Sequence, residues 1–99
     1  MKNILNKLDR LLENRIRLGI MSALMVNKSI DYISLKELLS VTDGNLASHL
    51  KGLESKSFIE VKKQFVGRKP KTSYRCTPEG KNAFRSHLSA LENLINNKT

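Results

Sequence analysis

Hydrophobic residues recur every three or four positions in the first part of the chain, the spacing that places them on one face of a helix. One run covers residues 1–13 and a second covers Ile16–Leu24, with no glycine or proline between the two. The pattern predicts helix up to residue 26, either as one helix or as two with a kink near Asn14. Gly19 lies inside the second run and predicts a point where another backbone packs closely.

The next segment combines a strand signal with a helix-capping signal. Residues 31–33 are partly β-branched and aromatic, which predicts a brief strand. Ser34 and Glu37 then have the spacing of a capping box, in which each side chain accepts a hydrogen bond from the other residue's backbone N–H. The box predicts a short helix that begins at Ser34 and ends near residues 40–41.

A further helix follows directly, and its faces differ in character. Thr42 is the candidate N-cap, and Asp43 lies in the first turn, where the helix dipole favours a negative charge. Leu46, Leu50 and Leu53 form one apolar stripe at positions i, i+4 and i+7. The remaining faces carry small or polar residues, so this helix can enter a groove without steric obstruction.

From Phe58 the apolar period shortens to two, which predicts β-strands. Residues 67–71 contain glycine and proline and predict the turn of a hairpin, with residues 72–76 as the returning strand. Thr77 as N-cap and Pro78 at the first helical position then predict a long final helix. That helix carries a coiled-coil-like seam of apolar residues at Phe84, Leu88, Leu91 and Ile95.

The order of these elements predicts an α+β fold, mostly α, of the winged helix-turn-helix type. Its parts are a helix, a short strand, a helix, a recognition helix, a β-hairpin wing and a long C-terminal helix. A length of 99 residues suits one domain over residues 1–99. The 39% of apolar residues predict a modest core with little room for a deep ligand pocket.

The chain is strongly basic. It has 18 lysine and arginine residues against 9 acidic ones, a formal net charge of +9. A field of that sign attracts polyanions, and nucleic acid is the commonest one that a small protein meets. Net charge alone also fits a basic surface that binds nothing, so the placement of the charges matters more than their sum.

Three stretches carry a family resemblance: LDRLLENRIRLGIMSAL, SLKELLSVTDGNLASHLKGLE and FIEVKKQFVGRKPKTSYRCTPEGKNAF. Over residues 8–95 the chain resembles the winged-helix transcriptional regulators of bacteria and archaea. It is most similar to a small one-domain group related to the multiple-antibiotic-resistance and arsenical-resistance repressors. One departure is Lys56-Ser57, where the family usually has a small residue followed by glycine, and this weakens the C-cap of the preceding helix.

The resemblance implies that residues 42–56 form a recognition helix whose N-terminal end meets base edges in the major groove. The side chains agree with this role. Asn45 and Ser48 carry donors and acceptors suited to base edges. Thr42 can reach a phosphate through its hydroxyl or backbone N–H, and Lys51 would lie nearer the sugar–phosphate backbone.

Four other polar residues keep two interpretations each. Asp43 either accepts from a cytosine amino group or only caps the helix, and the cap is favoured. His49 either contacts a phosphate or is a partly buried core residue. Arg15 and Arg17 either reach the DNA backbone or form salt bridges within the chain.

The predicted hairpin carries a run of positive charge. No acidic residue lies between Glu60 and Glu79, a stretch that holds six basic residues. A charge run is often only a solvated face, but this one flanks the recognition helix, which favours contact with phosphates or the minor groove. Arg68 at the tip is the candidate for minor-groove insertion. The predicted DNA-binding residues of the wing are Lys62, Arg68, Lys69, Lys71 and Thr72.

The apolar residues near the two chain ends exceed what one small domain can bury. We expect a homodimer in which Leu5, Leu8 and Leu12 pack with Leu88, Leu91 and Ile95 across a two-fold interface. The alternative is that they only close the core of one chain. A two-fold dimer presents its recognition helices to successive major grooves, which predicts a palindromic operator with half-sites about 10 bp apart. A small-molecule effector would have room only at this interface.

Other kinds of site receive no support. One cysteine, Cys76, and two dispersed histidines, His49 and His87, give no zinc spacing, and packing is the favoured role of His87. No nucleophile–base pattern or glycine-rich phosphate loop is present. We therefore expect no metal, no cofactor and no enzymatic activity.

The sequence also predicts the cellular location of the protein. No apolar stretch approaches the roughly 20 residues that span a bilayer, and the first 15 residues are too polar for a signal peptide. A single cysteine excludes an intramolecular disulfide, which suits a reducing compartment. We expect a cytoplasmic protein without membrane contact.

The predicted function is that of a transcriptional regulator that binds double-stranded DNA sequence-specifically, with repression by promoter occlusion as the simplest mechanism. Two alternatives belong to other classes. One is a winged-helix protein-interaction module whose wing meets an acidic partner. The other is a nucleoid-type protein that coats DNA without sequence preference.

Overall fold

The computed structural model describes residues 5–97. Residues 1–4 of the predicted N-terminal helix lie outside the described part. The elements, in chain order, are two 3-10 turns, four α-helices and three strands: η1 (Leu5–Lys7), η2 (Arg10–Glu13), α1 (Arg15–Val26), β1 (Ile30–Asp31), α2 (Tyr32–Leu39), α3 (Asp43–Ser55), β2 (Ile59–Val66), β3 (Lys69–Cys76) and α4 (Pro78–Asn96).

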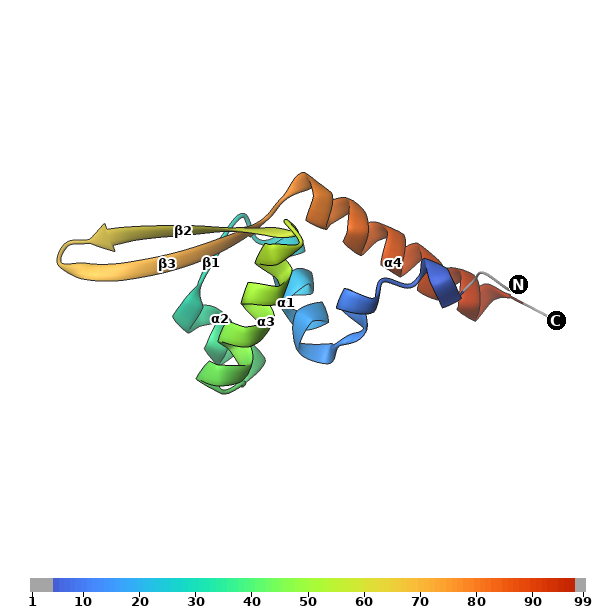
Figure 1. Ribbon diagram of the computed structural model, residues 1–99, viewed down its shortest axis with the longest axis horizontal. Coiled ribbons are helices and arrows are strands. Elements are labelled where there is room, and N and C mark those ends of the chain that lie inside the picture. Colours follow the sequence, from blue (N-terminus) through green and yellow to red (C-terminus); the bar gives the residue numbers. More distant parts are fainter. Residues whose placement is uncertain (1–4, 98–99) are drawn as a thin grey trace.

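The described chain is elongated, 59 × 25 × 21 Å, because two elements leave a small central body in opposite directions (Figure 1). Helices α1, α2 and α3 pack together to form that body. The β2–β3 hairpin projects from one end, while α4 runs away from the other end with η1 packed along it. The predicted α+β, mostly helical winged helix-turn-helix fold is confirmed.

The core is built by the helical leucine pattern that the sequence predicts. Leu46, Leu50 and Leu53 turn from α3 into the body and are buried. They meet Ile20 of α1 and Leu35 of α2 in one apolar cluster. Full burial of each such side chain contributes about 1.5–3 kcal/mol, so this cluster fixes the orientation of α3.

The three strands form one antiparallel sheet in the order β1-β3-β2. In the hairpin Ile59 lies opposite Cys76 and Val66 opposite Lys69, so the turn contains only Gly67 and Arg68. The predicted turn over residues 67–71 is therefore too long. Pro70 is accommodated inside β3 because β1 pairs only with residues 73 and 74, which leaves the rest of that side of β3 an open edge.

Before α1, the helical spacing of the sequence produces short 3-10 turns rather than an α-helix. Asn14 is the N-cap of α1, and its Oδ1 accepts from the backbone N–H groups of Ile16 and Arg17 at 2.9 and 3.1 Å. Asp9 caps η2 in the same way through Leu11 N at 2.9 Å. Such side-chain bonds to nearby backbone groups compete with a continuous helix, so the helix is interrupted at Asn14.

The predicted capping box at Ser34 is wrong, and so is the strand over residues 31–33. The strand is Ile30–Asp31, and α2 begins at Tyr32 with Asp31 as its N-cap. The Asp31 carboxylate accepts from the backbone N–H of Ser34 at 2.7 Å, and this bond lowers the pKa of the carboxyl group. A charged carboxylate so placed is the stronger acceptor, so it takes the capping position.

The helix after the strand ends as predicted, with Ser40 in the left-handed conformation at φ 52°. The close approach predicted at Gly19 is made by a side chain and not by backbone. A Cβ there would lie 3.1 Å from Cδ2 of Leu39. Gly80 of α4 has the backbone neighbour instead, because a Cβ on it would lie 2.1 Å from the carbonyl oxygen of Phe58.

The start of α4 follows the prediction, and its apolar seam is divided between the core and the surface of the single chain. The Thr77 hydroxyl accepts from Gly80 N at 2.9 Å, and Pro78 occupies the first turn. Of the predicted seam, Phe84 is buried in the core, but Leu88 and Ile95 are 41% and 80% exposed. The buried side of α4 is formed instead by Gly80, Phe84, His87 and Ala90.

Candidate nucleic-acid interface

The outer surface of α3 is polar and open, because the leucine stripe fixes which side turns inward. The predicted residues of this helix other than His49 are exposed: Thr42, Asp43, Asn45, Ser48 and Lys51. With a helical repeat of 3.6 residues, Ser48 and Lys51 lie opposite the buried leucines, and Asn45 shares a flank with His49. The sequence thus places small hydrogen-bonding groups on the surface that a DNA groove would meet.

The N-terminal end of α3 is held by side-chain bonds. The Thr42 hydroxyl accepts from Asn45 N at 3.3 Å, which confirms Thr42 as the N-cap. Lys36 Nζ lies 3.1 Å from Asp43 Oδ1, and the Tyr32 hydroxyl donates to the same oxygen at 3.2 Å. The hydrogen bond from Lys36 lowers the pKa of the Asp43 carboxyl group. These partners on α2 support a structural role for Asp43, which joins the two helices of the helix-turn-helix.

His49 is half-buried between α3 and α1. Arg17 Nη1 lies 2.9 Å from His49 Nδ1, and Arg17 Nε donates to the carbonyl oxygen of Leu11 at 2.6 Å. Because a guanidinium group only donates, Nδ1 must accept, and the neutral ring carries its proton on Nε2. Burial, and then the Arg17 charge, lower the pKa of His49. Arg17 therefore bonds to a carbonyl and an imidazole within the chain, and the salt-bridge alternative for this residue is not the interaction observed.

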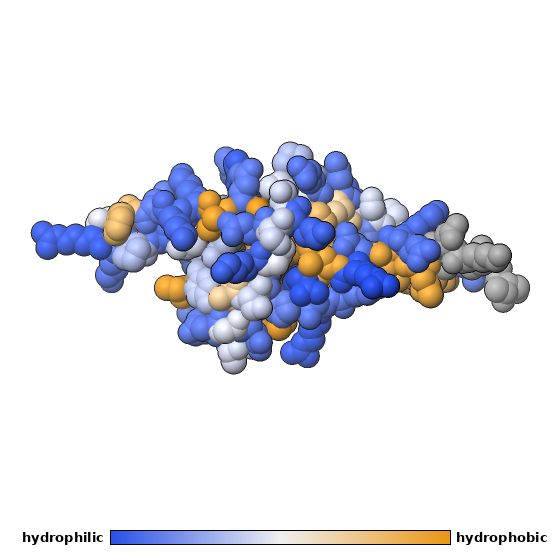
Figure 2. Space-filling view, in the orientation of Figure 1, coloured by the Kyte–Doolittle hydropathy of each residue, from blue (hydrophilic) through white to orange (hydrophobic). Residues whose placement is uncertain are grey.

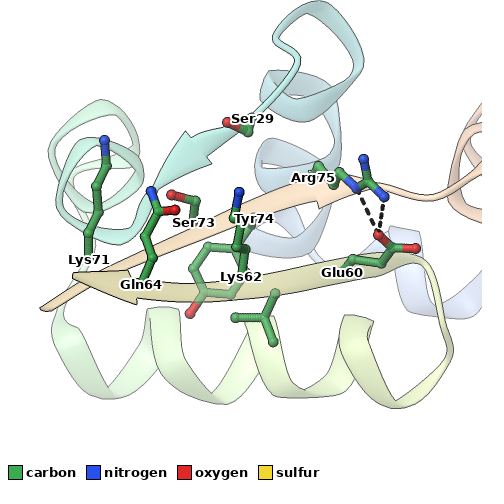
Figure 3. Close-up of a pocket in the computed structure, with 9 residues that line it drawn as sticks. Ser29, Glu60, Lys62, Gln64, Lys71, Ser73, Tyr74 and Arg75 are labelled. Atoms are coloured by element: carbon green, nitrogen blue, oxygen red, sulfur yellow. Dashed lines mark hydrogen bonds and ion pairs between the residues drawn. The ribbon is translucent and has the colours of Figure 1, made fainter. Parts of the chain in front are cut away.

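The wing has an outer face that points away from α3. Lys62, Gln64 and Lys71 extend from this face, while Tyr74 lies on the opposite side, above α3 (Figure 3). Arg75 belongs to the same basic run but is paired, since its Nη2 lies 2.7 Å from Glu60 Oε2. That ion pair neutralises the base of the wing and leaves the free positive charge nearer the tip.

The inner face of the wing is the side of the hairpin that, at its base, packs against the core. Ile59 is buried at its base, and Lys63 follows on the same side, opposite Thr72 in the strand register. Lys63 and Thr72 line a groove of about 830 Å³ together with Ala47 of α3. Helix α3, through Ala47, and the wing thus border one groove. Lys63 is absent from the predicted contact residues, although the alternation that starts at Ile59 could have found it.

The tip of the wing is cationic and uncovered. Arg68 occupies the two-residue turn, where Gly67 has φ +66°, and Lys69 begins the returning strand. Both cations are exposed, as are Lys62 and Lys71. The predicted wing residues therefore lie on both faces and at the tip, with Thr72 turned toward α3.

The residues predicted to form a dimer interface separate into two groups. Leu5, Leu88 and Ile95 are exposed, and Leu8 and Leu91 are half-buried. Leu12 is fully buried within the single chain, where it joins the central cluster. Its assignment to the interface is wrong, because the chain's own core covers it.

The residues considered for metal chemistry are dispersed. Within residues 5–97 no group of three or more histidine, cysteine, aspartate or glutamate side chains could hold a metal ion. His87 is buried, and its Nδ1 accepts from Asp9 N at 2.9 Å, which ties the N-terminal segment to α4. Cys76 is buried, and burial raises the pKa of its thiol. Across the same residues, no helix has the length and apolar character needed to cross a membrane.

Comparison with known proteins gives a consistent result. The family model described as a winged helix DNA-binding domain matches residues 16–95. The protein MJ0432 of Methanocaldococcus jannaschii, described as uncharacterized, is 35% identical over 82 residues, which are 83% of this chain and 89% of that protein.

Solved structures agree with the family match. A transcriptional regulator homologue from Pyrococcus horikoshii OT3 superposes with a TM-score of 0.84 at 31% identity, covering 95% of this chain and 91% of that one. A putative MarR-family transcriptional regulator from Porphyromonas gingivalis W83 has a TM-score of 0.70 at 21% identity, over 90% and 86% of the two chains. The second likeness concerns the fold alone.

Proposed function

This chain belongs to the winged helix DNA-binding domain family, and from that premise we propose that it is a transcriptional regulator that recognises a specific double-stranded DNA sequence. One observation carries the proposal. The groove along the cationic hairpin is closed by the first residues of α2 and reaches α3 at Ala47, next to the exposed Ser48, as expected of a protein that engages a major groove and the adjoining DNA backbone together.

In the proposed complex, α3 reads the bases. Asn45 and Ser48 are exposed and close to the N-terminal end of the helix, and their side chains suit base edges. Lys51 lies one turn from Ser48 and is expected to contact a phosphate. His49 would donate from Nε2 to a phosphate oxygen, since Nδ1 is bonded to Arg17.

The wing supplies affinity in the same complex. Arg68, Lys69 and Lys71 are exposed, and no described carboxylate forms an ion pair with Arg68 or Lys69, while Lys71 interacts electrostatically with Asp31. Each phosphate that such a cation neutralises releases counterions, so binding should weaken steeply as salt rises. The wing then holds the protein on DNA, and α3 selects the site.

We propose further that two copies act as a homodimer and repress transcription by occluding a promoter. Leu5 of η1 and Leu88 and Ile95 of α4 are exposed, on the two elements that lie at the end of the molecule opposite the wing (Figure 1), and a second copy can cover them. A two-fold dimer matches a palindromic operator with half-sites about 10 bp apart. A small molecule that controls binding would occupy the space between the two copies.

The experiment is fluorescence anisotropy with the DNA upstream of the protein's own gene and with a scrambled duplex of equal length, over a salt series. A preference of about 10³ or more for the upstream duplex, with a steep salt slope, supports sequence-specific regulation. Equal binding to both duplexes would favour a nonspecific coating protein. Absence of binding at low salt would favour the protein-interaction module.

A further inference from the structure

An apolar pair lies near the tip of the wing. Phe65 of β2 is 74% exposed, and Pro70 lies directly opposite it in β3 and is exposed as well. Figure 2 shows an apolar spot close to the far end of the hairpin, surrounded by hydrophilic residues. A single exposed apolar side chain needs no explanation, but an aromatic residue opposite a proline at the end of a projecting hairpin is a candidate contact surface.

The strand register decides which way this pair faces. Ile59, Val61, Lys63 and Phe65 alternate onto one face of β2, and the first of these is buried in the core. Phe65 is therefore on the face that is turned toward the helices at the base of the wing. Pro70 lines the groove that Ala47 of α3 also lines.

The charges around the pair define what can cover it. Lys63, Lys69 and Lys71 line the groove beside it, and Arg68 occupies the adjoining turn. The one carboxylate in the groove, Asp31, accepts from Ser34 N as the cap of α2. The partner must therefore present negative charge on both sides of an apolar strip. The DNA minor groove does so, because its walls are deoxyribose and its rims are phosphates, and apolar side chains of DNA-binding proteins enter it.

We propose that Phe65, backed by Pro70, packs against the deoxyribose walls of the minor groove next to the half-site that α3 reads. The proposal rests on the proposed function. It adds a contact that carries no charge, made by a residue that the charge pattern does not reveal. The cations around Phe65 hold the phosphate rims, and Phe65 removes its own apolar surface from water.

The test compares Phe65→Ala with two matched controls on the duplex that the wild type prefers. Val26→Ala removes an apolar side chain that is 82% exposed at the end of α1, outside the wing. Lys69→Gln removes a neighbouring charge. Phe65→Ala should weaken binding about ten-fold, the effect of losing a buried phenyl group, with an unchanged salt slope. Lys69→Gln should lower the slope by about one, and Val26→Ala should do neither.

A chemical footprint separates this contact from a structural effect. Hydroxyl radicals attack deoxyribose hydrogens in the minor groove, whereas dimethyl sulfate methylates guanine N7 in the major groove. The wild type should protect minor-groove sugars beside each half-site. Phe65→Ala should lose that protection, retain the guanine protection and keep the wild-type melting temperature, because Phe65 is exposed in the free protein.

The two proposals fail in different ways. If the wild type binds no duplex, both are overturned. If the wild type binds and Phe65→Ala behaves like Val26→Ala, the minor-groove contact is wrong while DNA binding stands. If Phe65→Ala leaves the footprint intact but abolishes binding to phosphatidylglycerol vesicles, the tip is a membrane contact and the inference is overturned.

Discussion

Helix α3 and the wing border one groove, yet different forces hold them in place. Helix α3 is fixed from several sides: three leucines enter the core, Lys36 and Tyr32 bond Asp43, and Arg17 bonds His49. The outer half of the wing buries no side chain and is held by its strand pairing and a two-residue turn. One part of the proposed DNA interface is fixed by packing in the core, and the other lies on a projecting hairpin.

This difference suits two tasks. Base recognition needs donors and acceptors held within a fraction of an ångström, which packing against a core provides. Phosphate contacts tolerate looser geometry, because Coulomb attraction depends weakly on orientation and long basic side chains adapt. Substitutions should therefore couple stability with recognition in α3, and change affinity without changing stability in the wing.

The largest contrast should come from removing one apolar side chain in each region. Leu46→Ala leaves a cavity under α3 and should lower the free energy of unfolding by about 2–5 kcal/mol. Phe65→Ala in the wing should change it by less than about 0.5 kcal/mol. Urea titrations followed by circular dichroism measure both. Equal losses would show that the wing is part of the core after all.

Specificity should be lost from α3 alone. Asn45→Ala and Ser48→Ala should each reduce discrimination between the preferred and a mismatched duplex by about 1–3 kcal/mol, because a base contact disappears. Binding to scrambled DNA should stay near the wild-type level. Competition anisotropy gives both constants. An equal loss on both duplexes would assign these residues to the DNA backbone.

Substitutions in the wing should lower the affinity for DNA and leave the sequence preference unchanged. Lys69→Gln should weaken binding to preferred and scrambled duplexes by the same factor and lower the salt slope by about one, since one phosphate contact is removed. Lys81→Gln, in the first turn of α4 and outside the proposed interface, is the charge-matched control. A slope that falls equally in both variants would mean that net charge matters and position does not.

A smaller effect is expected where α3 ends. Ser57 adopts φ +62°, a left-handed conformation that glycine tolerates better than serine. Ser57→Gly should raise the free energy of unfolding by about 0.5–1 kcal/mol, because the left-handed conformation costs a residue with a Cβ about 1–2 kcal/mol and the greater unfolded-state entropy of glycine costs about 0.5–1 kcal/mol. Thermal melting detects it, and DNA binding should be unchanged. A lower melting temperature would show that the unfolded-state entropy outweighs the relief of strain.

The smallest effect concerns pH. The pKa of His49 is lowered in the folded protein, so below the ordinary value of 6.5 the unfolded chain binds more protons than the folded one. Stability therefore falls as pH drops through that value, down to the pKa of the folded state. His49→Gln removes this contribution, so the wild type should lose more stability than the variant between pH 7.5 and pH 5.5. Parallel losses would show that His49 is not held neutral.

Local signals in the sequence were enough to predict the helix-turn-helix, the hairpin and their order. Thr42 and Thr77 cap their helices because an N-cap depends on bonds within one turn. The same locality explains the failure at Ser34, where two acceptors three residues apart competed and the carboxylate of Asp31 took the cap.

Features that depend on distant parts of the chain could not be found in this way. The bond between Arg17 and His49 joins residues 32 positions apart, and it decides the tautomer of a candidate DNA contact. Leu12 and Leu88 have the same residue type and similar spacing, but only the fold shows that one is buried and the other exposed. The basic run of the sequence was enough to predict that the wing is cationic. The side of the hairpin on which each wing residue lies could be assigned only from the strand register.

Selection from a randomised duplex library, with sequencing of the bound DNA, tests most directly whether α3 selects the sequence and the wing supplies affinity. Three proteins are compared: the wild type, Arg68→Gln, and the double variant Asn45→Ala with Ser48→Ala. We expect one palindromic motif for the wild type, the same motif at lower yield for Arg68→Gln, and a relaxed or altered motif for the double variant. A motif that disappears in Arg68→Gln but persists in the double variant would show that the wing, and not α3, selects the DNA sequence.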